Sequence, residues 1–234
     1  MTMIPNTSAD LARCIDYALL KPETTAAQVD RLCDECVQYG FFAACVNPVW
    51  VSRCVRRLAG SRTAVVAVAG FPLGASLPAT KADEARRAIE QGAAEIDMVV
   101  NLGALLAGDD AAVSHDIAAV VAAVAEANPK ALVKVILETR ALTDEQIILG
   151  CRCACEAQAD FVKTSTGFHP AGGATVEHVK LLKQHADPLK VKAAGGIRDL
   201  NAALAMLAGG ADRLGVSAGP ALVGQMNAGE APLL

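Results

Sequence analysis

The sequence predicts an α/β protein, a single (β/α)8 barrel (TIM barrel) spanning residues 1–234. Three observations support this fold. Short β-branched apolar runs alternate with Ala-rich amphipathic stretches, as in parallel strands joined by helices. Eight such runs are present, and no Gly/Ser-rich or Pro-rich linker divides them. The length of 234 residues also suits one barrel with one core.

The eight predicted strands start roughly 20 to 40 residues apart, which leaves room for one crossover helix each time. They are 13–18, 43–46, 63–69, 95–100, 132–138, 161–164, 189–194 and 213–216. Helix starts are signalled by Thr24-Thr25, by Pro48, by a capping box of Thr143 with Gln146, and by Asp199. An open doubly wound sheet is the alternative, and the strand count favours the barrel.

Charge and composition point to a small-molecule substrate. The net charge is −4 and no Lys/Arg block occurs, which argues against nucleic-acid or anionic-membrane partners. No apolar run reaches the roughly 18 residues of a transmembrane helix, and the N-terminus lacks a signal-peptide layout. We therefore expect a cytoplasmic protein.

The cysteines and histidines do not suggest a metal site. Without a secretion signal, the eight cysteines are expected to be reduced. The CxxC of Cys33 and Cys36 and the CxCxC at 151–155 fall in helical patterns without a nearby histidine, so packing is the favoured role. The four histidines show no ligand spacing, and we expect them on the surface or in loops. No metal or cofactor is predicted.

One charged residue in each of four predicted strands needs particular attention: Asp97, Lys134, Lys163 and Lys192. Strands buried on both faces should be almost wholly apolar, so these charges need an explanation. A single lysine could reach solvent from a strand end or pair with a carboxylate. Four charges converging inside a barrel favour catalysis, because several lysines near one aspartate should disfavour the ammonium form. A free amine is what Schiff-base chemistry requires.

Glycines follow the last two predicted strands, at Gly195-Gly196 and around Gly215 and Ser217. Glycine lets backbone N–H groups approach an anion closely, and helix N-termini behind these loops would add positive dipole ends. This is the usual phosphate position on (β/α)8 barrels. The string Gly215-Val-Ser-Ala-Gly219 is not expected to be a hydrolase nucleophile elbow, because no histidine and acid follow it.

Six segments carry a resemblance over nearly the whole chain. They are Ile15-Asp-Tyr-Ala-Leu-Leu-Lys-Pro22, Gly70-Phe-Pro-Leu-Gly74, Glu95-Ile-Asp-Met-Val-Val-Asn101, Lys134-Val-Ile-Leu-Glu-Thr139, Phe161-Val-Lys-Thr-Ser-Thr-Gly167 and Val191-Lys-Ala-Ala-Gly-Gly-Ile-Arg198, with Gly172-Gly-Ala-Thr175 as a further match. In these segments the sequence resembles the deoxyribose-phosphate aldolases.

The resemblance implies a class I aldolase, a lyase that reversibly cleaves 2-deoxy-D-ribose 5-phosphate to D-glyceraldehyde 3-phosphate and acetaldehyde. It implies that Lys163 forms the Schiff base, that Lys192 perturbs it and that Asp97 relays protons. Lys134, Asp16 and Thr166 would support them. The implied phosphate-binding residues are Gly167, Gly195, Gly196, Ile197, Gly215 and Ser217.

Several residues depart from the family pattern. Tyr17-Ala18 replaces a frequent His-Thr, which puts one polar substrate contact in doubt. Val216 and Ala218 flank Ser217 where some members have more hydroxyl groups. Phe168 stands where one branch has a phosphate-contacting lysine.

Three other functions remain open on the sequence. A transaldolase or ketose-phosphate aldolase would use Lys163 on a different donor. A phosphosugar isomerase would keep the phosphate loops but not need an imine. A phosphate-binding regulatory protein would leave the lysines unexplained. We also expect a homo-oligomer, with a dimer as the specific prediction.

Overall fold

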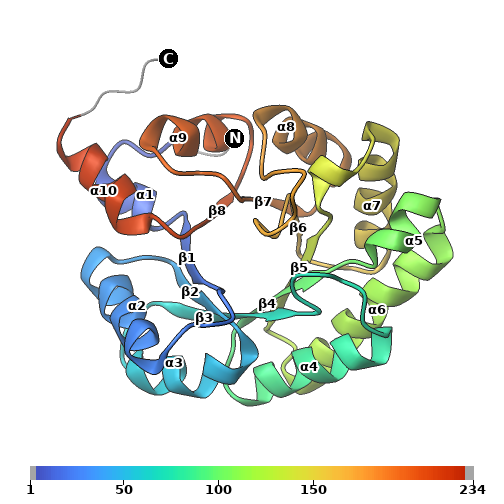
Figure 1. Cartoon of the computed structure of the whole chain (residues 1–234), viewed down its shortest axis with the longest axis horizontal. Helices are drawn as coiled ribbons and strands as arrows, with labels where there is room; N and C mark the ends of the chain where they lie inside the picture. The colour runs from blue at the N-terminus through green and yellow to red at the C-terminus, as the bar shows by residue number, and fades with distance from the viewer. Residues whose placement is uncertain (1–3, 230–234) are drawn as a thin grey trace.

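The computed structural model describes residues 4–229 and confirms the eight-stranded barrel. All strands are parallel, and the sheet closes through pairing of β1 with β8. Figure 1 shows the strands in the middle of the molecule with the helices around them. The strands are β1 Ile15–Leu19, β2 Ala43–Val46, β3 Ala64–Ala69, β4 Glu95–Val99, β5 Leu132–Ile136, β6 Phe161–Lys163, β7 Lys190–Ala194 and β8 Arg213–Val216. Each differs from its predicted range by at most two residues at either end.

Helices connect the strands. They are α1 Ser8–Ala12, α2 Ala26–Tyr39, α3 Val51–Arg57, α4 Pro78–Glu90, α5 Leu102–Ala107, α6 Asp110–Ala127, α7 Asp144–Glu156, α8 Val176–His185, α9 Leu200–Ala208 and α10 Gly219–Asn227, with short 3-10 turns η1 Pro48–Trp50 and η2 Thr139–Ala141. Helices α2, α7 and α9 begin at the predicted signals, whereas Pro48 begins a 3-10 turn that leads into α3. Thr143 and Gln146 form the predicted capping box of α7, and Asp199 caps α9. Local sequence chemistry therefore sets most helix starts.

The main hydrophobic core lies between the barrel and the surrounding helices. It is built largely from Ala, Val, Leu and Ile, and the CxxC cysteines Cys33 and Cys36 of α2 are buried in it. Cys151 and Cys153 of α7 are buried there too, while Cys155 is partly exposed. These positions agree with the packing role expected for the cysteines. No helix within residues 4–229 has the length and apolar character needed to cross a membrane.

Candidate active site

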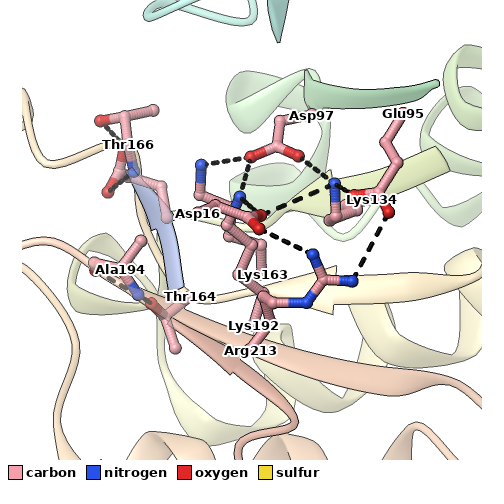
Figure 2. Close-up of polar contacts among 11 residues, drawn as sticks. Asp16, Glu95, Asp97, Lys134, Lys163, Thr164, Thr166, Lys192, Ala194 and Arg213 are labelled. Carbon is pink, nitrogen blue, oxygen red and sulfur yellow. Dashed lines mark hydrogen bonds and ion pairs between the residues drawn. The ribbon is translucent and has the colours of Figure 1, made fainter. Parts of the chain in front are cut away.

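Charged side chains from six strands meet inside the barrel and form what we call the charge cluster. Its members are Asp16 of β1, Glu95 and Asp97 of β4, Lys134 of β5, Lys163 of β6, Lys192 of β7 and Arg213 of β8. All are at least 92 % buried. Alternate residues of each strand face the barrel interior, so neighbouring strands bring these side chains together. Figure 2 shows the resulting network.

Asp97 is the centre of the charge cluster. Its Oδ1 accepts a hydrogen bond from Lys134 Nζ at 2.9 Å, and its Oδ2 accepts from Lys163 Nζ at 2.7 Å and Lys192 Nζ at 2.8 Å. Burial alone would raise the pKa of Asp97, but the three ammonium groups outweigh it and hold the pKa well below its usual range. Asp97 is therefore a permanent carboxylate that holds three lysines in fixed positions.

Two further carboxylates complete the charge cluster. Asp16 Oδ1 accepts from Arg213 at 2.7 Å and Oδ2 accepts from Lys192 at 2.5 Å. Burial opposes ionisation of Asp16, yet Lys192, Lys134 and Arg213 lower its pKa. Glu95 Oε2 lies 2.5 Å from Lys134 Nζ, at an ion-pair distance but without hydrogen-bond geometry. Three carboxylates thus face four cations.

From the sequence, several lysines near a single aspartate were expected to disfavour the ammonium form. This prediction is wrong for Lys134 and Lys192, because three carboxylates face the four cations. Burial lowers the pKa of Lys192, but Asp16 and Asp97 more than compensate and the pKa is raised. The pKa of Lys134 is raised in the same way, chiefly by Asp97. Both side chains therefore remain ammonium groups. Glu95 and Arg213, the first residues of β4 and β8, were left out of the charges considered from the sequence, although both lie in predicted strands.

A cavity of about 400 Å³ opens above the charge cluster. Lys163 and Lys192 border it, whereas Lys134, Asp97 and Asp16 lie outside its lining. Lys192 Nζ is held by two carboxylates, Asp16 and Asp97, while Lys163 Nζ donates to Asp97 alone. Lys163 is consequently the cavity-facing amine with the fewer bonds to break before it can react.

The predicted residues of the glycine loops, with Thr166, line the same cavity as the two lysines. They are Thr166, Gly167, Gly195, Gly196, Ile197, Gly215 and Ser217. Gly167, Gly195 and Gly196 have positive φ values of 83°, 87° and 79°, which favour glycine. The residues predicted to bind phosphate therefore border one cavity, around the ends of β6, β7 and β8.

Two N–H groups in the first turn of α9, the helix behind the β7 loop, form hydrogen bonds within the protein. Ala202 N of α9 donates to the Asp199 side chain at 2.8 Å, and Leu200 N donates to Gln225 Oε1 at 2.8 Å. These bonds use two first-turn N–H groups internally.

Several cavity residues were missed in the sequence. Lys21, after β1, and Arg198, after β7, border the cavity beside the glycine loops, and Cys45 of β2 lies in its wall. Lys21 and Arg198 gave only a weak signal in the sequence, because a charged side chain in a loop is usually only solvated. Phe168 also lines the cavity and packs edge-on against Phe71, with ring centroids 5.2 Å apart.

The departures from the family pattern fall on different faces of β1 and β8. Ala18 borders the cavity, while the Tyr17 hydroxyl donates to Glu35 Oε2 of α2 at 2.7 Å. The polar contact in doubt therefore concerns position 18. Val216 lines the cavity, and Ala218 lies outside its lining at the start of α10.

Glu138 is a further residue that the sequence argument passed over. It follows β5 in the left-handed backbone region at φ 62° and is 2 % exposed. Its carboxylate accepts hydrogen bonds from the Thr166 backbone N at 3.2 Å and from the Thr166 hydroxyl at 2.5 Å. Burial raises the pKa of Glu138. Glu138 thus anchors the start of the β6 loop that borders the cavity.

The glycine loops are packed too tightly for a side chain at Gly173. A Cβ atom there would lie 2.1 Å from the backbone oxygen of Gly195. We expect Gly173→Ala to displace the Gly195 loop and raise KM for a phosphorylated substrate by about tenfold or more, with a smaller change in kcat. Steady-state kinetics would measure this. Gly224→Ala in α10 is the control, because a Cβ there meets nothing within 4 Å; equal kinetics for both variants would contradict the prediction.

The histidines lie outside the charge cluster. His115 is exposed on α6, and His169 is a partly buried loop residue. His178 and His185 lie near the two ends of α8, and His178 Nδ1 is 3.0 Å from the Thr139 hydroxyl. Within residues 4–229, no group of three or more His, Cys, Asp or Glu side chains could hold a metal ion.

Comparison with known proteins gives consistent matches. The family model for the DeoC/LacD family aldolases matches residues 12–223. Deoxyribose-phosphate aldolase 1 of Bacillus licheniformis is 52 % identical over 221 residues, covering 94 % of this chain and 97 % of that protein. The deoxyribose-phosphate aldolase of a Geobacillus species is 50 % identical, covering 92 % and 95 %. The tetrameric deoxyribose phosphate aldolase structure from Aeropyrum pernix superposes with a TM-score of 0.88 at 32 % identity, covering 96 % and 94 %.

Proposed function

The chain belongs to the DeoC/LacD family of aldolases, and we propose that Lys163 is its Schiff-base nucleophile. The enzyme is a lyase that reversibly cleaves 2-deoxy-D-ribose 5-phosphate to D-glyceraldehyde 3-phosphate and acetaldehyde. The observation that carries the assignment of Lys163 is its amino group at the cavity wall, hydrogen-bonded to Asp97 at 2.7 Å. Lys192 is the other cavity lysine, and two carboxylates hold it.

In the synthetic direction, the neutral amine of Lys163 attacks the carbonyl carbon of acetaldehyde and forms a carbinolamine. Release of one proton from Lys163 leaves three cations facing the three carboxylates of the charge cluster. The cluster then has equal numbers of positive and negative charges. The number of cations stays at three when the cationic iminium forms, because Lys192 gives up its proton in the same step.

Lys192 is the acid and base that we assign to the next steps. Its ammonium group gives a proton to the carbinolamine hydroxyl, which leaves as water while the iminium forms. The neutral Lys192 amine then takes a proton from the methyl carbon of the iminium, and the enamine results. Each proton given is returned.

We assign Asp97 an orienting role in this relay. Its low pKa makes it a weak proton acceptor, but its Oδ2 accepts from both Lys163 and Lys192. One oxygen can therefore keep both nitrogen atoms near the reacting carbon while their protonation changes. Lys134 fixes the other oxygen of Asp97 at 2.9 Å.

The enamine attacks the aldehyde carbon of glyceraldehyde 3-phosphate and forms the new C–C bond, while the Lys192 ammonium group gives a proton to the aldehyde oxygen and the iminium forms again. We propose that Gly167, Gly195, Gly196, Ile197, Gly215 and Ser217 hold the phosphate, with Thr166 supporting the β6 loop. Fixing a remote phosphate orients the reacting carbon and lowers the barrier without contact to the reacting atoms. Water hydrolyses the product iminium and frees Lys163. In this hydrolysis, the neutral Lys192 amine takes a proton from the attacking water.

Borohydride trapping tests the proposal. The protein is incubated with acetaldehyde, reduced and digested, and the ethylated lysine is located by mass spectrometry. We expect modification at Lys163. Ethylation spread over exposed lysines, or no adduct at all, would remove the support for an imine at this residue. Dihydroxyacetone as the alternative donor separates this activity from that of a transaldolase or ketose-phosphate aldolase, because it should give no adduct.

We also propose that the protein forms a homodimer in the cytoplasm. Large apolar side chains are exposed at Val37, Val49, Leu73 and Leu77, which offers surface for self-association. The Aeropyrum pernix relative is named as a tetramer. Sedimentation velocity would decide the assembly, and a monomer at micromolar concentration would disprove it.

A further inference from the structure

We propose that Lys21 binds the substrate phosphate, and that with Arg198 it supplies the positive charge of a phosphate site otherwise made of loop backbone. Lys21 follows β1, whereas the glycine loops follow β6, β7 and β8. Because β1 pairs with β8 in the closed barrel, the segment after β1 borders the same cavity as Gly196 and Ser217. This inference rests on the deoxyribose 5-phosphate substrate.

The charged residues that line the cavity are all lysine or arginine. Four of its lining residues are cationic, and none of them is acidic. Lys163 and Lys192 have Asp97 and Asp16 as partners. Lys21 and Arg198 form no ion pair within residues 4–229. A phosphate ester carries about −1.5 to −2 charges at neutral pH, so these two uncompensated cations match it.

The backbone of Lys21 is held by hydrogen bonds, whereas its side chain is exposed. The Lys21 carbonyl accepts hydrogen bonds from Thr24 N at 3.1 Å and Thr24 Oγ1 at 2.7 Å. Asn47 Nδ2 donates to the preceding Leu20 carbonyl at 3.1 Å, and Pro22 restricts the Lys21 backbone further. The exposed Lys21 side chain thus extends from a fixed backbone, which reduces the entropy lost on binding an anion.

The β6 loop lines the cavity with Thr166, Gly167 and Phe168, none of which is charged. Phe168, on the β6 loop, packs on Phe71 and brings no charge, and two first-turn N–H groups of α9 donate to Asp199 and Gln225. Loop N–H groups provide hydrogen bonds but not a full compensating charge. Lys21 borders the cavity at the end of β1, beside β8, and supplies a positive charge there.

The test is Lys21→Met, which keeps the aliphatic stem and removes the charge. We expect the ratio of kcat/KM for 2-deoxyribose 5-phosphate to that for unphosphorylated 2-deoxyribose to fall about tenfold, mainly through KM. The inhibition constant for inorganic phosphate should rise by a similar factor. Lys21→Arg should keep most of the ratio. Lys130→Met is the matched control, because Lys130 is exposed in the turn before β5, and its ratio should not change.

An unchanged ratio in Lys21→Met, or equal losses on both substrates, would overturn the assignment. Thermal melting of each variant shows whether the fold is intact, and the phosphate inhibition constant is read from a properly folded sample. Failure of the wild-type enzyme to cleave deoxyribose 5-phosphate would instead contradict the function itself. Binding of inorganic phosphate, measured by calorimetry on wild type and Lys21→Met, still tests Lys21 in that case.

Discussion

Replacing Lys163 with arginine is expected to reduce kcat by a factor on the order of 10⁴ or more while leaving the fold intact. Arginine keeps a cation beside Asp97, whose Oδ2 accepts from Lys163 at 2.7 Å. A guanidinium group does not deprotonate in proteins, so it cannot attack a carbonyl. The change removes the nucleophile and preserves the charge of the cluster. Steady-state cleavage of deoxyribose 5-phosphate measures the loss.

The control for this variant is Lys180→Arg, at an exposed position of α8. It should retain wild-type activity, and both variants should melt close to the wild type. Lys163→Arg should also lose the acetaldehyde adduct in borohydride trapping. A variant that keeps more than about one hundredth of the wild-type kcat would favour an isomerase-like mechanism without an imine.

Replacing Lys192 with methionine is expected to affect both catalysis and stability. The variant leaves the Asp16 and Asp97 carboxylates buried without their shared partner. Removing one member of a buried charge network costs about 3–5 kcal/mol in the free energy of unfolding. Loss of the proton donor should also lower kcat by about 10²–10⁴. Denaturant unfolding and steady-state kinetics measure the two effects separately.

Lys190→Met on the same strand is the matched control. Lys190 is exposed at the start of β7, with its Nζ 5.7 Å from the Phe161 ring centroid. Its loss should cost no more than about 1 kcal/mol. If both variants unfold at the same denaturant concentration, Lys192 does not hold the charge cluster together.

The pH dependence of this difference follows from the direction of the pKa shift. The pKa of Lys192 is raised in the folded protein. Its contribution is therefore complete below the unfolded pKa of about 10.4 and is lost as the pH rises through the folded pKa. The difference between wild type and Lys192→Met should stay constant from about pH 6 to 9 and shrink only in stronger alkali. A marked decrease between pH 6 and 9 would contradict the raised pKa.

The sequence by itself determined the fold and the group of strand charges that contains Lys163, the proposed nucleophile. Apolar runs with helical stretches between them specified eight parallel strands, because burial on both faces requires such runs. Lys163 and Asp97 stood out since a charge inside a buried strand is costly without a partner or a use. These conclusions depend on local patterns, which a single sequence contains.

The tertiary structure decided the charge balance and the membership of the site. Asp16 and Arg213 are 197 positions apart in the sequence and meet only because β1 pairs with β8. Lys21 reaches the cavity for the same reason. Electrostatic shifts depend on every neighbour within a few ångströms, so the raised pKa of Lys192 could not be obtained before Asp16 was known to face it. Strand patterns identify which residues are unusual, whereas closure of the barrel decides which of them are neighbours.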